Sequence, residues 1–125
     1  MHVWVVKGMW TEREKYISAH NEIKEYLEAM DAFHDYRIGN IAVAEECITI
    51  TVEEIVPAKH VSESAGQIWD FNFKDIEKFK MNNDCVGSFI ITEITMEDDA
   101  IIFGCTNGCF EIKANSIQIG IPSVK

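Results

Sequence analysis

Apolar and polar residues alternate along most of this chain, which is the pattern of half-buried β-strands. The alternation is clearest in ECITITVEEI, residues 46–55, where Ile48, Ile50 and Val52 share one face. RIGNIAVA, residues 37–44, is the expected neighbouring strand. The same pattern predicts further strands at residues 2–6, 68–73, 84–96, 100–114 and 116–121.

Short turn signals separate these strands. Asn107-Gly108 lies inside the segment 100–114 and predicts a tight β-hairpin there. Gly39-Asn40 indicates a bulge or a break within its strand. Asn115 and Ser116 predict a turn before the last strand, and the polar segment 57–67 predicts the longest loop.

One segment has helical periodicity instead. Thr11 and Glu14 fit a capping box, in which the hydroxyl and the carboxylate each accept a bond from the other residue's amide. Apolar residues then recur at steps of three and four, so we expect a helix from about 12 to 31, with Asn21 as an alternative start. The apolar stripe consists of Tyr16, Ile17, Ile23, Leu27 and Met30, together with His20.

Strands joined by short turns cannot form a parallel sheet, because parallel neighbours need crossover connections. With 125 residues, 47% of them hydrophobic, we expect a single domain spanning 1–125. The predicted fold is α+β: one N-terminal amphipathic helix packed on a curved antiparallel β-meander or two-layer sheet of seven to eight strands. Trp69, Phe71 and Phe73 share a face that is either core or an apolar surface for a homo-oligomer.

The chain is acidic, with 21 Asp and Glu against 11 Lys and Arg and a net charge of −10. No basic stripe is present, so we expect neither a nucleic acid nor a membrane surface as partner. A basic protein is the partner that this charge favours. Carboxylates gather at two predicted turns, which are candidate partner-binding patches: Glu45 and Glu46, and Glu97, Asp98 and Asp99.

The four cysteines are Cys47, Cys85, Cys105 and Cys109. The N-terminal segment has no export signal, so we expect a cytoplasmic protein with reduced thiols. A three-residue hairpin loop would place Cys105 opposite Cys109, as a disulfide or half a zinc site, whereas a two-residue loop would send them to opposite faces. The simpler interpretation is small apolar thiols in a sheet, and no cofactor is expected.

His34 and Asp35 form the one candidate catalytic or metal-binding pair. A metal-dependent phosphohydrolase built on such a pair needs further His and Asp ligands from other helices, and the pattern predicts a single helix. The alternative is a helix-to-strand junction. In it His34 lies near the helix C-terminus, and Asp35 forms a hydrogen bond in the turn into the next strand.

The segment YLEAMDAFHDYRIGNIAVAEECITITVEEI, followed by the aromatic strand at 68–73, resembles a loose group of small bacterial proteins of unassigned function. In that group a short helix ends in Phe-His-Asp and a β-meander follows, and some members are immunity proteins that neutralise toxins. The resemblance covers residues 23–80 and implies an α+β fold, a cytosolic location and no established catalysis. The favoured function is a non-enzymatic protein-binding module, with an immunity-type inhibitor of a basic toxin as one form of it. The alternative is a small metal- or ligand-dependent enzyme that uses His34 and Asp35.

Overall fold

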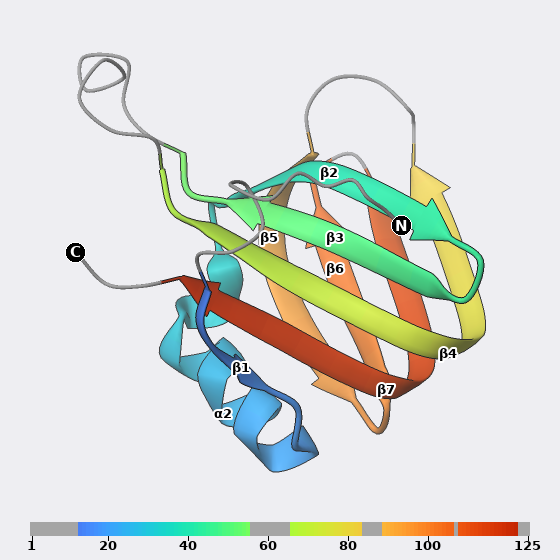
Figure 1. Ribbon diagram of the computed structural model, residues 1–125. Coiled ribbons are helices and arrows are strands. Elements are labelled where there is room, and N and C mark those ends of the chain that lie inside the picture. Colours follow the sequence, from blue (N-terminus) through green and yellow to red (C-terminus); the bar gives the residue numbers. More distant parts are fainter. Residues whose placement is uncertain (1–12, 56–65, 84–88, 107, 123–125) are drawn as a thin grey trace.

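The computed structural model describes residues 13–55, 66–83, 89–106 and 108–122. Within these ranges the protein is mostly antiparallel sheet with one α-helix (Figure 1). The elements in chain order are β1 (Arg13–Ile17), α2 (His20–Ala29), the 3-10 turn η1 (Asp31–Phe33), β2 (Arg37–Ala44), β3 (Cys47–Glu53), β4 (Ile68–Asn83), β5 (Phe89–Glu97), β6 (Ala100–Cys105) and β7 (Gly108–Pro122).

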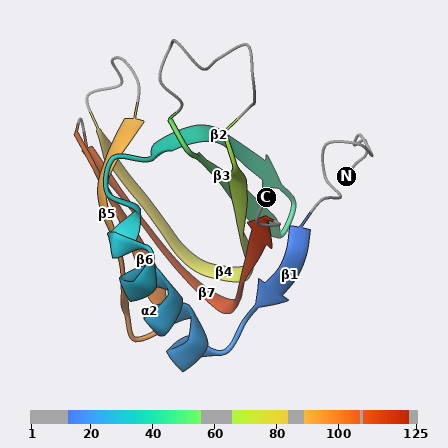
Figure 2. The ribbon, with the colours of Figure 1, turned by 90° about the vertical axis from the view of Figure 1, so that its left-hand side faces the viewer.

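The sheet consists of two three-stranded meanders that join at both sides. Strands β2, β3 and β4 form one meander, and β5, β6 and β7 form the other. The two meanders pair through β4 with β7 and, over two residue pairs only, through β2 with β5. The sheet therefore closes on itself as a barrel, to which β1 adds as an outer strand on β7 (Figures 1 and 2). The expectation of an antiparallel sheet is confirmed, although the sheet is not one simple meander.

Strand β7 is continuous through the position where the sequence predicted a turn. Ser116 pairs with Lys74 and Ile117 with Phe73, so Asn115 and Ser116 lie in a regular ladder with β4. The predicted turn is wrong because the long pairing with β4 outweighs the weak turn preference of two polar residues.

The helix begins later than its periodicity predicted. Arg13–Ile17 form β1, in which Tyr16 pairs with Gly120 and Ile17 with Ile119 of β7. The prediction of a helix from residue 12 is therefore wrong: the helix begins at His20, near the alternative start, and a strand precedes it. Tyr16 and Ile17 fit a helical stripe by position alone, but pairing with β7 buries Ile17.

Several other predictions are confirmed. A register shift between Ile38 and Asn40 marks a bulge at Gly39, and the hairpin joins β6 to β7, although residue 107 itself lies outside the described residues. The segment predicted at 68–73 is the first part of a longer strand, β4. The strand predicted at residues 2–6, Thr11 of the capping box, and most of the loop 57–67 also lie outside the described residues.

Aromatic side chains fill the barrel beneath the helix. Trp69, Phe71 and Phe73 are buried, which confirms that they are core residues. Phe33 has no exposed surface, and its ring centroid lies 5.3 Å from that of Trp69 and 5.6 Å from that of Phe71. These edge-to-face contacts anchor the end of α2 in the core. No helix in the described ranges is long and apolar enough to cross a membrane.

Candidate functional site

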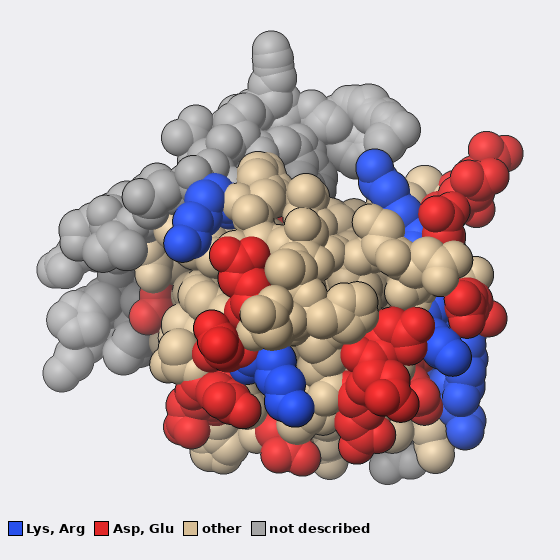
Figure 3. Space-filling model, turned by 90° about the horizontal axis from the view of Figure 1, so that it is seen from below, with Lys and Arg blue, Asp and Glu red and all other residues tan. Residues whose placement is uncertain are grey.

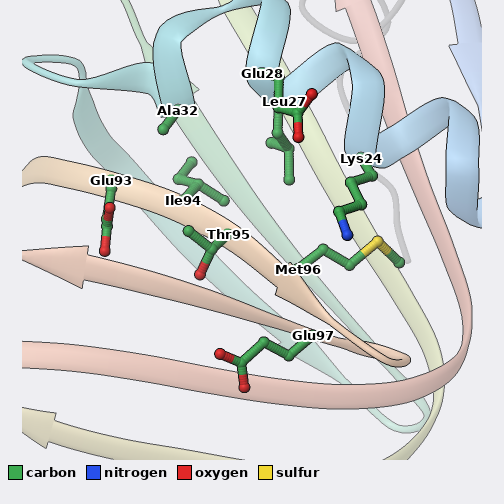
Figure 4. Close-up of a pocket in the computed structure, with 9 residues that line it drawn as sticks. All are labelled: Lys24, Leu27, Glu28, Ala32, Glu93, Ile94, Thr95, Met96 and Glu97. Carbon is green, nitrogen blue, oxygen red and sulfur yellow. The ribbon is translucent and has the colours of Figure 1, made fainter.

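A groove of about 350 Å³ lies between α2 and β5 (Figure 4). One wall is α2 and the turn after it, and the other is five consecutive residues of β5. This volume is in the range of small binding pockets in proteins. The residues that line it are Lys24, Leu27, Glu28, Ala32, Glu93, Ile94, Thr95, Met96 and Glu97.

The floor of the groove is apolar. Leu27 and Ile94 are buried, and Met96 packs against the core from the edge of the groove. Leu27 lies one turn after Ile23 on the buried face of α2. Ile94 pairs with Phe103 of β6, so its side chain points to the inner side of the barrel. In Figure 4, Leu27 and Ile94 approach each other between the helix and the strand.

The rim of the groove carries three carboxylates and one ammonium group. Glu93 and Glu97 lie on the same face of β5, since residues two apart share a face of a strand. Glu28 lies one turn from Lys24 on α2. All four side chains are exposed, and no ion pair joins the three carboxylates to another described residue. The groove therefore has a negative rim around an apolar floor.

Acidic residues also predominate on the wider face below the groove. Figure 3 shows the side seen from below in Figure 1, where α2 and the β5–β6 turn lie. Red side chains outnumber blue ones on it and alternate with uncharged surface. The negative charge of the groove is therefore part of a larger acidic face.

The two predicted acidic turns lie in different places. Glu97 lines the groove, and Asp98 and Asp99 follow it in the β5–β6 turn. Glu45 and Glu46 form the β2–β3 turn and border a second hollow of about 440 Å³. That hollow is also lined by Val43, which is 68% exposed, and by residues of β2, β3 and the middle of β4. The fold does not bring the two turns into one site.

His34 and Asp35 lie at an exposed junction. Their side chains contact each other, with 3.2 Å between Nδ1 and Oδ2, and are 56% and 76% exposed. The helix ends at Ala29, so His34 lies beyond the last helical turn and not beside the helix C-terminus as expected. The backbone N–H of Asp35 donates to the carbonyl of Ile91 at 2.9 Å, which ties the junction to β5. In the described part of the chain, no three His, Cys, Asp or Glu residues gather closely enough to hold a metal ion.

At this junction the chain reverses direction through residues with a left-handed backbone conformation. Asp31, Ala32, Phe33 and Asp35 all have positive φ, between 56° and 73°. For residues with a Cβ this conformation costs roughly 1–2 kcal/mol each. The cost is offset because the reversal drives the ring of Phe33 into the core. The Phe-His-Asp segment therefore lies between helix and strand as the junction interpretation expected, although His34 is beyond the helix end and the Asp35 carboxylate contacts His34.

The hairpin cysteines lie on opposite faces. Cys105 pairs with Gly108 and Cys109 with Gly104, so the loop has two residues, and both thiols are free. Cys109 is exposed, whereas Cys105 is half-buried. Burial, and to a smaller extent the neighbouring Cys109, raises the pKa of the Cys105 thiol to about 11. The arrangement offers neither a disulfide nor a pair of zinc ligands.

Sequence reasoning missed most of this groove. It identified Glu97 as a partner-binding residue and Leu27 as part of an apolar stripe, but not Glu28 or Glu93. The available signal was the alternation of Glu93 and Glu97 around Ile94 within one strand. Their proximity to α2 depends on the barrel closing, which local patterns do not show.

Comparison with protein-family models, with curated proteins and with solved structures found no match to this chain.

Proposed function

We propose that this protein is a non-enzymatic protein-binding module that binds a basic protein through the groove between α2 and β5. The observation that carries the proposal is the combination of an apolar floor, of which Met96 is partly exposed, with exposed rim carboxylates that form no ion pair with a described residue. A cationic, partly apolar surface is complementary to that combination.

The two parts of the groove have different physical effects. Leu27 and Ile94 are already buried, so the apolar surface that a partner can cover is that of the partly exposed Met96, at about 25 cal/mol per Å² buried. The carboxylates of Glu28, Glu93 and Glu97 accelerate encounter with a cationic partner and select against acidic ones. The net charge of −10 extends this attraction beyond the groove.

The form of the module that the sequence resemblance favours is an immunity-type inhibitor of a basic toxin, such as a nuclease, in the cytosol. An acidic face that covers a cationic active site would block a phosphate-bearing substrate. The alternative, a metal- or ligand-dependent enzyme that uses His34 and Asp35, has weaker support because both side chains are exposed at the junction.

A pair of matched charge reversals tests the proposal. Glu93→Lys with Glu97→Lys alters the groove, and Glu45→Lys with Glu46→Lys makes the same change in net charge at the β2–β3 turn. Binding would be measured by biolayer interferometry against a panel of purified basic nucleases at physiological ionic strength. We expect the groove variant to lose about tenfold or more in affinity, equivalent to about 1.4 kcal/mol, and the control to lose much less. Equal losses in both variants, or no binding by the unaltered protein, would contradict the proposal.

A further inference from the structure

We propose that the second half of β4, residues 77–82, binds an extended peptide segment of alternating acidic and apolar residues, which adds to the sheet as a new strand. Between this segment and the groove lie β7 and β6, because the sheet runs in the order β4, β7, β6, β5 on this side. The surface is therefore separate from the groove, and the proposal goes beyond the proposed function.

The second half of β4 has a neighbouring strand on one side only. Pairing of β3 with β4 ends at Lys74. At Asp75 the backbone has a φ of 54°, a bulge follows between Ile76 and Lys78, and β4 bends away from β3. From the bulge to Asn83, β7 is the one described strand that pairs with β4. Figure 1 shows this part of β4, in yellow, at the margin of the sheet.

This margin is exposed along its whole length. All six residues from 77 to 82 are exposed. Phe79 and Met81 are 39% and 48% exposed. Their partners on β7 are Ile112 and Phe110, which have no exposed surface. The helix α2 lies on the other side of the molecule (Figure 1). The apolar inner face of the sheet therefore continues to a strand that nothing covers among the described residues.

The direction of the backbone groups of β7 shows which groups of β4 are bonded. Gly108 follows the two-residue hairpin loop and pairs across it, so its backbone groups bond to β6. The N–H of Ala114 also points to that side, since it donates to the carbonyl of Asp99 at 3.4 Å. Successive residues of a strand alternate in direction, and therefore the backbone groups of Glu111 point to β4.

The backbone groups of Phe79 and Met81 point to the open side. Lys80 is the partner of Glu111, so its N–H and C=O bond to β7. Phe79 and Met81 precede and follow Lys80, and their groups point the other way. No described strand pairs with β4 on that side. The margin thus presents two donors and two acceptors to an added strand.

The lysines of this segment argue against a second copy of the chain as the added strand. Antiparallel self-pairing centred on Phe79 places Lys78 of one copy opposite Lys80 of the other. Pairing centred on Lys80 places that residue opposite itself. Like charges directly opposite each other destabilise a ladder, and lysine on an edge strand is a common protection against pairing of identical edges.

The same lysines favour an acidic segment. Lys80 forms no ion pair with a described residue, and Nζ of Lys78 lies 3.6 Å from Oε2 of Glu111 in an exposed pair. Ligand residues opposite the lysines should be Glu or Asp, because opposite charges across a ladder are favourable. The alternate ligand residues lie opposite Phe79 and Met81 and should be Val, Leu or Ile. Main-chain bonds supply affinity in this mode, and alternate side chains supply specificity.

Amide hydrogen exchange measured by NMR tests whether the margin is open. In the free protein the amides of Phe79 and Met81 should exchange about tenfold or more faster than those of Lys78 and Lys80, which bond to β7. The probe is a capped peptide of about eight residues that alternates glutamate and valine. Saturating peptide should slow exchange at Phe79 and Met81. Slow exchange of these two amides in the free protein, or no slowing by the peptide, would overturn the proposal.

Fluorescence anisotropy with the same peptide tests the charges. Lys78→Glu with Lys80→Glu should lower the affinity about tenfold or more. The matched control is Lys15→Glu with Lys24→Glu, which makes the same change in net charge on β1 and α2 and should lower the affinity much less. Circular dichroism would check that both variants are folded. Equal losses in the two variants would overturn the proposal.

N-methylated peptides test the main-chain bonds. A strand bonded along one edge uses the N–H of every second residue, so one peptide carries N-methyl groups on all valines and another on all glutamates. One of the two should lose about tenfold or more in affinity while the other retains it. Equal affinity of the two peptides would overturn strand addition. None of these failures affects the proposed function, which is tested with basic nucleases at the groove.

Discussion

The indole N–H of Trp69 in β4 donates a hydrogen bond of 2.8 Å to the hydroxyl of Tyr26 in α2. Tyr26 immediately precedes Leu27, so this bond fastens the helical wall of the groove to the opposite side of the core. The ring of Phe33 lies against both partners, with its centroid 6.2 Å from that of Tyr26 and 5.3 Å from that of Trp69. The helix is therefore held by one directional bond within an apolar cluster.

Replacing Tyr26 by Phe should destabilise the protein by about 1–2 kcal/mol, because the partly buried indole N–H of Trp69 loses its acceptor. Urea unfolding monitored by circular dichroism would measure the change. The dependence of the unfolding free energy on urea concentration should stay the same. Tyr16→Phe is the matched control, since the side chain of Tyr16 is 48% exposed, and its effect should stay within about 0.5 kcal/mol. An unchanged free energy of unfolding in Tyr26→Phe would show that apolar contacts alone hold the helix.

Stability should fall at alkaline pH. Burial raises the pKa of Tyr26, although the hydrogen bond from Trp69 partly opposes this, and burial together with the charge of Glu54 raises the pKa of Tyr36. A raised folded-state pKa favours the neutral phenol, so this stabilisation is complete below the unfolded value near 10 and is lost as pH rises above it. Urea midpoints between neutral pH and about pH 11 should decline, and decline less in Tyr26→Phe. Urea midpoints that do not change over this pH range would contradict the raised pKa values of Tyr26 and Tyr36.

The two hairpin thiols should differ in reactivity. Thiolate is the reactive form, and a pKa of about 11 leaves little thiolate on Cys105 near neutral pH, whereas Cys109 is exposed. Brief treatment with iodoacetamide, followed by peptide mass spectrometry, should label Cys109 about tenfold or more faster than Cys105. Under urea the two rates should converge. Comparable rates in the folded protein would mean that the hairpin opens frequently.

The junction should tolerate loss of the His34 imidazole. His34→Ala should change the free energy of unfolding by less than about 0.5 kcal/mol, because the ring is exposed and its polar contact is with the exposed Asp35 carboxylate. Asp35 has φ of 73°, so Asp35→Gly should be neutral or stabilising and Asp35→Val should cost roughly 1–3 kcal/mol. Thermal unfolding of the three variants would test this order. Strong destabilisation by His34→Ala would assign the ring a role that its exposure does not suggest.

Gly39 should resist substitution because of one neighbouring side chain. A Cβ at this bulge would collide with the carboxylate of Glu53, which accepts a bond of 2.8 Å from Arg37. Gly39→Ala should cost up to about 1 kcal/mol through loss of that partly exposed pair. In a Glu53→Ser background the same substitution should cost clearly less, and a double-mutant cycle would measure the difference. Additive effects would contradict the steric argument.

Sequence patterns predicted the elements in which one face is uniformly apolar. Ile48, Ile50 and Val52 alternate without interruption, and their strand is found where expected. The patterns were wrong where long-range pairing overrides local preference. Arg13–Ile17 fits a helical stripe but pairs with β7, and Asn115 suits a turn but continues a ladder with β4. Both errors involve β7, which pairs with β1, β4 and β6.

The candidate groove was only partly predictable for the same reason. The excess of carboxylates and the position of Glu97 were visible in the sequence. The apposition of α2 and β5 depends on the left-handed reversal at Asp31–Phe33, and no residue there is a glycine that would signal it.

The pairing of β1 with β7 has a consequence for synthesis of the chain. Tyr16 pairs with Gly120, so β1 has no partner strand until β7 has left the ribosome. Until then β4 also lacks the ladder that covers its second edge. Apolar strands of the nascent chain therefore stay uncovered until β7 has emerged, and we expect slow folding that depends on chaperones at high expression.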